Sequence, residues 1–200
     1  MITTKLHFVE EKNGESLAAQ KSRLREYMKN RRAENENRDG KERLLLENFK
    51  TFLLQQGINE QRKFFIYLSF SMEAPTDELI TTLLQADHEI YCPRIENGDM
   101  VMAKYGNDFT LSHMGIREPM GDSYDGQIDY IVVPLLAADA QGNRLGYGKG
   151  YYDRFLKKYP NAKRIGYCYD FQILKNVPTE RHDQPLNWII TDKRIFQMEK

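Results

Sequence analysis

The sequence has no excess of charge of either sign, because 29 lysines and arginines balance 29 aspartates and glutamates over 200 residues. A chain with zero net charge has no general attraction for nucleic acid or for an anionic membrane surface. We therefore expect no nucleic-acid partner. Any anionic ligand must be held by a local arrangement of donors.

Cysteine is also scarce, with only Cys92 and Cys168 in the chain. Both lie in apolar, β-like runs, without the paired spacing or the further ligands that a zinc site requires. We predict two reduced thiols in the core, which suits the cytoplasm. The four histidines show no metal-ligand spacing either, and we expect none of them to be catalytic.

Long apolar runs are missing as well. No uninterrupted run reaches the roughly eighteen residues of a membrane-spanning helix, so we expect no membrane partner. Residues 1–16 include acidic residues and no apolar stretch, a pattern unlike a secretory signal peptide. We predict one cytoplasmic domain over residues 1–200 that acts as a monomer, with residues 1–15 as a mobile arm.

Helical and strand patterns alternate along the rest of the chain. Helical spacing predicts helices from Ser16 to a polar break at 35–40, then at 41–56, 75–86 and 150–158. Short apolar runs predict strands at 63–70, 89–92 (stopped by Pro93), 100–105, 128–134, 164–169 and 187–191, the last before a tail. In the first helix, Ala19, Leu24, Tyr27 and Met28 could share one stripe. This alternation predicts an α/β fold whose mainly parallel sheet is covered on both faces.

A glycine-rich segment, residues 142–154, follows the strand predicted at 128–134. Gly146, Gly148 and Gly150 alternate, which removes side chains where backbone N–H groups must approach a ligand closely. Ligands bind beyond the carboxyl ends of strands in open parallel sheets, and a following helix N-terminus favours phosphate. The segment is therefore predicted to bind the phosphates of a nucleotide.

Charged residues in the same segment support this prediction. Arg144 and Lys149 supply local positive charge, and Asp153 is able to hold the hard cation that accompanies a triphosphate. The segment is not a Walker A motif, since Asn143 stands five places before Gly148 where that motif needs glycine. Its spacing does not match a Rossmann fingerprint either. The simpler interpretation is a glycine-rich turn with tyrosines packed in the core.

Residues 139–154 closely resemble the signature of the 5-formyltetrahydrofolate cyclo-ligases, also called methenyltetrahydrofolate synthetases. The resemblance extends over roughly residues 18–193. Further elements that look like those of the family lie at 21–25, at 67–73 followed by Thr76, at 90–94, at 115–119 and at 177–183. Tyr147 departs from the pattern, which leads us to expect glycine or arginine, and its role stays unassigned.

The resemblance implies a three-layer α/β/α sandwich with a mainly parallel sheet and an N-terminal helical segment. It also implies an ATP- and Mg²⁺-dependent carbon–nitrogen ligase that closes 5-formyltetrahydrofolate, or its polyglutamylated forms, to 5,10-methenyltetrahydrofolate and releases ADP and phosphate. In this chemistry the formyl oxygen is phosphorylated and N10 then attacks. Such a transfer needs positioning and charge neutralisation above all.

The resemblance also implies residue roles by position. The catalytic residues would be Arg144, Lys149 and Tyr151. ATP would be bound by Lys21, Ser22, Arg23, Leu24, Arg25, Arg144, Leu145, Gly146, Tyr147, Gly148, Lys149, Gly150, Tyr151 and Tyr152. The folate would be bound by Leu68, Glu73, Tyr147, Gly148, Lys149, Gly150 and Tyr151, and the metal by Asp153 and Asp183.

Several of these residues have simpler interpretations. Lys21 and Arg25 could belong to a solvated basic face, and Glu73 could favour the start of a helix by its charge. Asp153 could be an acid of a first helical turn, and Tyr152 is more typical of a core than of a site. Two other functions stay open: an ATP-dependent kinase or ligase for a different small amide, and a non-catalytic RNA-binding relative.

Overall fold

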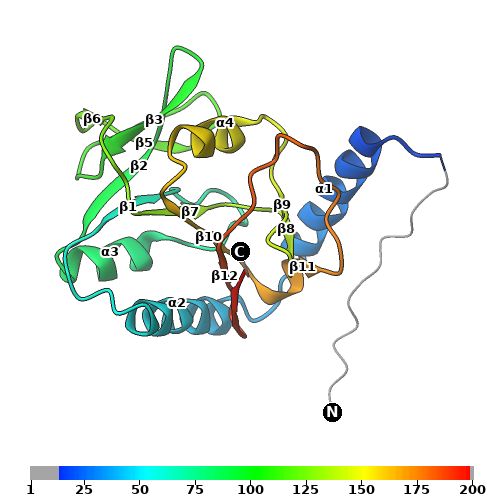
Figure 1. Ribbon diagram of the computed structural model, residues 1–200, viewed down its shortest axis with the longest axis horizontal. Helices are drawn as coiled ribbons and strands as arrows, with labels where there is room; N and C mark the ends of the chain where they lie inside the picture. The colour runs from blue at the N-terminus through cyan, green and yellow to red at the C-terminus, as the bar shows by residue number, and fades with distance from the viewer. Residues whose placement is uncertain (1–13, 199–200) are drawn as a thin grey trace.

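The computed structural model describes residues 14–198 (Figure 1), so most of the arm predicted at 1–15 lies outside the described residues. The main sheet has the strand order β13-β12-β10-β7-β1-β2-β3-β6. Its strands are β1 (Lys63–Ile66), β2 (Glu89–Glu96), β3 (Asp99–Lys104), β6 (Ser123–Tyr124), β7 (Tyr130–Val133), β10 (Lys163–Tyr167), β12 (Trp188–Ile190) and β13 (Ile195–Gln197). The helices are α1 (Leu17–Ala33), α2 (Arg38–Gln55), α3 (Asp77–Gln85) and α4 (Tyr151–Lys158), with a short 3₁₀ turn at Asp170–Gln172.

The centre of the sheet is parallel. Strands β12, β10, β7, β1 and β2 pair in parallel, whereas β3, β6 and β13 add antiparallel edges. Parallel strands need crossover connections, and α3 connects β1 to β2 while α4 connects β7 to β10. The predicted α/β fold with a mainly parallel sheet is confirmed.

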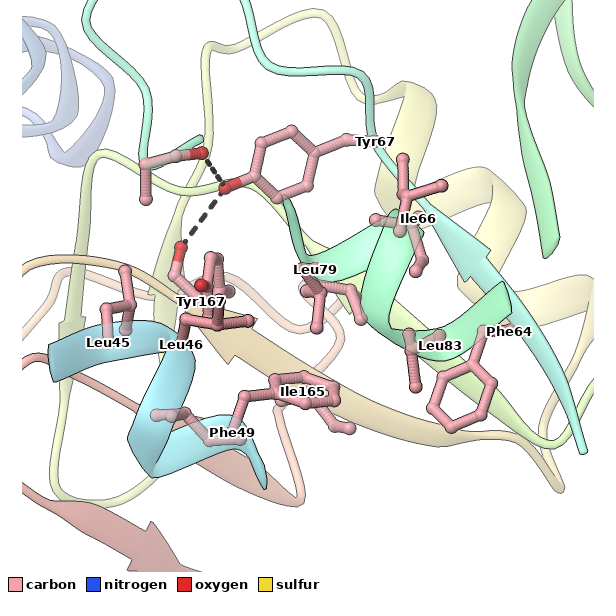
Figure 2. Close-up of a cluster of buried hydrophobic side chains, with 14 of the residues drawn as sticks. Leu45, Leu46, Phe49, Phe64, Ile66, Tyr67, Leu79, Leu83, Ile165 and Tyr167 are labelled. Atoms are coloured by element: carbon pink, nitrogen blue, oxygen red, sulfur yellow. Dashed lines mark hydrogen bonds between the residues drawn. The ribbon is translucent and has the colours of Figure 1, made fainter. Parts of the chain in front are cut away.

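Helices α2 and α3 cover one face of the sheet (Figure 1). Figure 2 shows Phe49 of α2 and Leu79 and Leu83 of α3 against strand residues such as Ile66 and Ile165. These apolar side chains are fully or almost fully buried, and each contributes about 1.5–3 kcal/mol when removed from water. The cluster on this face is the largest hydrophobic core among the described residues.

Helix α4 covers the opposite face, where Phe155 stacks on Phe65 of β1 with ring centroids 4.3 Å apart. A small sheet of β8 (Ala137–Asp139), β9 (Arg144–Leu145) and β11 (Ile173–Leu174) lies beside the main one. A hairpin of β4 (Phe109–Leu111) and β5 (Arg117–Pro119) completes the strands of the described residues. The two covered faces confirm the three-layer arrangement.

Helix α1 packs on the small sheet rather than on the main one. Ser16 caps it by accepting a hydrogen bond from the Ala19 N–H at 3.3 Å. Leu24 and Met28 enter a core with residues of β8 and β9, as the predicted stripe requires. Ala19, predicted on that stripe, is exposed, and the cations Lys21 and Arg32 are buried on the helix face instead.

Several predicted boundaries were wrong. Strand β2 continues through Pro93 because β1 pairs with it only as far as Tyr91, and proline is tolerated where a strand has a free edge. The tail expected after 187–191 contains β13, and the loop expected before the glycines contains β8 and β9. Helix α2 begins at Arg38, three residues before its predicted start.

Cys92 and Cys168 are buried and form no disulfide, as predicted. Burial raises the pKa of both thiols, which makes them poor nucleophiles. Within residues 14–198, no helix combines the length and the apolar character needed to cross a bilayer.

Candidate functional site

The site forms where β1 and β7, adjacent parallel strands, reach their carboxyl ends. The turn at 67–76 follows β1, and the segment at 134–150 follows β7. This edge of the sheet is where an α/β fold binds ligands. Helix α1 joins the site from outside the main sheet (Figure 1).

The glycine loop has the backbone that its sequence predicts. Gly148 has φ +92° and Gly150, the N-cap of α4, has φ +69°, a region that side chains other than glycine rarely adopt. The Nε of Arg25 donates to the Gly146 carbonyl at 3.0 Å. A Cβ on Gly148 would lie only 3.0 Å from the Arg25 guanidinium carbon, so α1 lies directly against the loop.

Arg144 lies buried at the base of the loop. Its Nη2 donates to Oδ1 of Asp153 at 2.6 Å, and its guanidinium lies 5.9 Å from the ring centroid of Tyr152. Among the described residues, the Nε of Arg144 and the hydroxyl of Tyr152 are buried without a hydrogen-bond partner. Buried polar atoms of this kind need a partner, and a bound ligand or water would provide one.

Lys149 is the exposed cation of the loop. Within residues 14–198 no carboxylate lies within ion-pair distance of its ammonium, which donates to the sulfur of Met114 at 2.6 Å. Lys149 is therefore free to meet an anion.

Tyr151, the third predicted catalytic residue, is half-buried on α4, and the Arg154 guanidinium lies 5.0 Å from its ring centroid.

Lys21 is buried, so it does not belong to a solvated basic face. Its ammonium bonds to Oε2 of Glu180 at 2.8 Å and to Oδ2 of Asp183 at 2.7 Å. Burial alone would lower the pKa of Lys21, but these carboxylates outweigh it and raise the pKa. The element at 21–25 and the segment at 177–183 thus meet, although they are far apart in the sequence.

The backbone that follows Asp183, one predicted metal ligand, lies near the carboxylate of Asp153, the other. The Gln184 N–H, next to Asp183 in the chain, points to Asp153 Oδ1 at 3.4 Å. Glu180, His182 and Asp183 each offer a ligand atom, all within 4.8 Å of one another. Glu180 was not predicted as a member of the site, because an exposed acid in a polar loop gives no distinctive signal.

Glu73 is held by two donors. Its Oε2 accepts the Phe70 N–H at 2.9 Å, and its Oε1 accepts the hydroxyl of Tyr147 at 2.5 Å. Tyr147, whose role the sequence left open, therefore joins the glycine loop to the turn after β1. Its hydroxyl also accepts a hydrogen bond from Nη1 of Arg32 at 2.9 Å.

Arg32 was missed because it lies in a run of basic residues. It follows Lys21 by eleven residues, three helical turns, and both are buried on one face of α1. That spacing was the signal available in the sequence.

Burial raises the pKa of Glu73, while the bonds from Tyr147 and Phe70 and the charge of Arg32 oppose the rise. Phe70 and Met72 form an exposed apolar rim on the turn that carries Glu73. The ring of Phe70 also lies beside Gly115 of the β4–β5 turn. A half-buried carboxylate with an apolar rim suits a flat heterocycle that carries N–H donors.

The other predicted ligand residues on α1 and after β1 differ in burial. Leu24 and Leu68 are buried in hydrophobic cores, so only their backbone atoms could meet a ligand. Arg23 pairs with Glu15, and Ser22 is exposed on α1.

Comparisons with known proteins agree on one family. The model of the 5-formyltetrahydrofolate cyclo-ligase family matches residues 17–192. The Escherichia coli (strain K12) 5-formyltetrahydrofolate cyclo-ligase is 31% identical over 143 residues, covering 66% of this chain and 79% of that protein. The Haemophilus influenzae 5-formyltetrahydrofolate cyclo-ligase is 33% identical over 132 residues, and this match covers 60% of this chain and 71% of that protein.

A solved structure has the same fold. The NMR structure of Aquifex aeolicus 5,10-methenyltetrahydrofolate synthetase matches with a TM-score of 0.78 at 26% identity. The match covers 90% of this chain and 93% of that one.

Proposed function

Because the chain belongs to the 5-formyltetrahydrofolate cyclo-ligase family, we propose that it converts 5-formyltetrahydrofolate to 5,10-methenyltetrahydrofolate with ATP and releases ADP and phosphate. The observation that carries the proposal is the hydrogen bond between Tyr147 and Glu73. It brings a loop suited to phosphate and a carboxylate suited to a pterin into one site. A phosphoryl donor and its acceptor need this proximity.

ATP is proposed to bind beside the contact between the glycine loop and α1. The Gly146, Gly148 and Gly150 backbone and the start of α4 would receive phosphate oxygens through N–H groups. Lys149 offers an exposed charge from the loop, and Arg25 supplies one from α1. Lys21 would join them when its bonds to the carboxylates rearrange.

The folate is proposed to lie against Glu73. A carboxylate accepts the adjacent N–H groups of a pterin in a bidentate manner, and the exposed ring of Phe70 offers an apolar surface beside it. Tyr151 and the Tyr152 hydroxyl, which is buried without a hydrogen-bond partner, would then face the reacting end of the substrate.

The reaction needs an activated formyl oxygen, because that oxygen is a poor leaving group. The γ-phosphoryl group is transferred to it and ADP leaves. N10 then attacks the formyl carbon and loses its proton to solvent, and the C–O bond breaks to release phosphate. Arg144 and Lys149 would stabilise the negative charge that develops on the transferred group. No side chain has to form a covalent bond.

The carboxylates at the site fit a Mg²⁺ ion that accompanies ATP. Asp153 and Asp183 offer oxygen ligands, and the Lys21 ammonium bound to Asp183 indicates that this position favours positive charge. Mg²⁺ held by these two residues would neutralise charge on the phosphates. We further propose that the protein acts as a monomer in the cytoplasm, and the two buried free thiols support the cytoplasmic location.

The test is a spectroscopic assay. Purified protein is mixed with 5-formyltetrahydrofolate and MgATP, and the near-ultraviolet absorbance of the methenyl product is followed, with reactions lacking ATP or folate as controls. We expect a rise only in the complete mixture, with ADP formed in equal amount. ATP binding without any rise would indicate a different acceptor and refute the proposal. Salt-dependent RNA binding without turnover would indicate a binding module instead.

A further inference from the structure

Arg32 is a buried cation at the C-terminal end of α1. The residue is only 6% exposed. Its Nη1 donates to the Tyr147 hydroxyl at 2.9 Å, and its guanidinium carbon lies 5.5 Å from the centroid of the Tyr147 ring. Tyr147 is 39% exposed, so it lies between a buried cation and the open site.

The Tyr147 hydroxyl connects this cation to Glu73. A phenol carries one proton, so the bond accepted from Arg32 directs that proton to Oε1 of Glu73. The other carboxylate oxygen accepts the Phe70 N–H. Each oxygen of Glu73 has one protein donor and keeps a lone pair for a ligand.

A purely structural role does not explain this arrangement. In residues 14–198 no carboxylate lies within ion-pair distance of Arg32, and its buried Nε has no hydrogen-bond partner. Burying an arginine without a direct counter-ion is costly. A helix C-terminus attracts cations, but Arg31 also occupies the last turn and is less buried.

We infer that Arg32 and Tyr147 are positioning residues that hold the carboxylate of Glu73 for the pterin, an inference that rests on the proposed function. Arg32 orients the Tyr147 hydroxyl, and that hydroxyl fixes one oxygen of Glu73. A carboxylate that is already fixed loses less freedom when it binds a ligand. Helix α1 thereby supports the folate through Arg32 and the nucleotide through Arg25.

The test compares Arg32→Gln with Arg31→Gln, which removes the same charge from the same helical turn without touching Tyr147. Kinetics with 5-formyltetrahydrofolate and MgATP give separate KM values for each substrate. We expect Arg32→Gln to raise the folate KM about tenfold, the effect of one lost charge-assisted hydrogen bond. The ATP KM should change by less than about twofold, and Arg32→Lys should restore most of the folate affinity.

A double-mutant cycle tests whether Arg32 acts through Tyr147. Tyr147→Phe keeps the ring and removes the hydroxyl, so it should raise the folate KM by itself. Adding Arg32→Gln to Tyr147→Phe should then have little further effect. Because Tyr147 is partly exposed, this variant provides the test even if Arg32→Gln does not fold.

Three results would overturn the inference: equal folate KM values for Arg32→Gln and Arg31→Gln, equal increases in both KM values, or additive effects in the cycle. In each case the wild-type protein still forms product. If the wild-type protein forms no methenyl product, the proposed function itself fails. The two failures are therefore distinguishable.

Discussion

Among single residues, Lys149 is an exposed cation of the glycine loop with no ion-pair partner in the described part of the chain, unlike Arg144 and Lys21. Arg144 is paired with Asp153, and Lys21 with Asp183. The charge of Lys149 is thus available to the transferred phosphoryl group. We expect Lys149→Ala to lower kcat at least about tenfold, the scale of losing one preorganised charge contact. An unchanged rate, matching that of Lys157→Ala on the exposed end of α4, would remove Lys149 from the mechanism.

The protonation of Glu73 gives a second prediction. Burial raises its pKa above the ordinary value of 4.5, so the carboxylate protonates at a higher pH than an exposed glutamate. Folate affinity should therefore fall as the pH drops through this raised pKa. The fold should persist there, because protonation relieves the penalty of burying the charge. Folate binding measured from pH 7 to pH 4, alongside thermal melting, checks both parts.

The groups around Glu73 decide how far this pKa moves. Tyr147, the Phe70 N–H and Arg32 favour the ionised form. The buried hydroxyls of Tyr67 and Tyr152 are near enough to interact with its charge, and the Arg38 guanidinium bonds to its backbone carbonyl. Glu73→Gln should weaken folate binding far more than ATP binding. It should also remove the fall in folate affinity at low pH. Equal loss of both ligands would mean that Glu73 does not bind the folate.

Among the elements, the glycine loop and α1 lie in direct contact, and a substitution of Gly148 tests this contact. Alanine at φ +92° is strained, and its Cβ would lie 3.0 Å from the Arg25 guanidinium carbon. Gly98→Ala is the matched control, because Gly98 has φ +82° but no atom within 4 Å of a new Cβ. Both variants should lose about 1 kcal/mol of stability from the backbone. Only Gly148→Ala should also weaken ATP binding; equal ATP affinities would contradict the contact between α1 and the loop.

The elements that the sequence predicted are those with an apolar pattern several residues long. Strands β7 and β10 were predicted from short apolar runs, and helix α2 from apolar positions at helical spacing. Strands β8 and β9 contain only two or three residues, too few for a period to appear. Strand β2 continues past Pro93 because of its neighbours in the sheet, which a local pattern cannot indicate.

Of the candidate site, the sequence indicated the glycine loop and the element at 21–25, because both resemble known motifs. The roles of their partners depend on contacts between distant segments. Tyr147 could not be assigned because Glu73 is 74 residues away in the chain. The contacts of Arg32 with Tyr147 and of Glu180 with Lys21 are likewise formed only by the fold, and neither residue has a distinctive local pattern.

In the whole molecule, the site is assembled from segments near both ends of the described chain. The ammonium of Lys21 on α1 donates to the carboxylate of Asp183, which lies 162 residues later in the chain. Helix α1 contacts the small sheet rather than the main one, and this pair adds a polar link to the apolar contacts of Leu24 and Met28. The Lys21 side chain is 7% exposed and that of Asp183 is 17% exposed, so water screens the pair only partly.

Asp183→Asn is therefore expected to loosen α1 more than the main core. The partial exposure limits the loss to about 1 kcal/mol, a fall in Tm of roughly 2–4 °C. Melting in EDTA excludes a metal contribution, and Asp99→Asn, which breaks only the exposed pairs with Arg154 and Lys158 at 3.8 Å, should change the Tm little. Native-state hydrogen exchange should show faster exchange in α1 while α2 keeps its protection, since α2 is packed on the sheet. Uniform acceleration in both helices would mean that the Lys21–Asp183 pair stabilises the whole fold rather than the docking of α1.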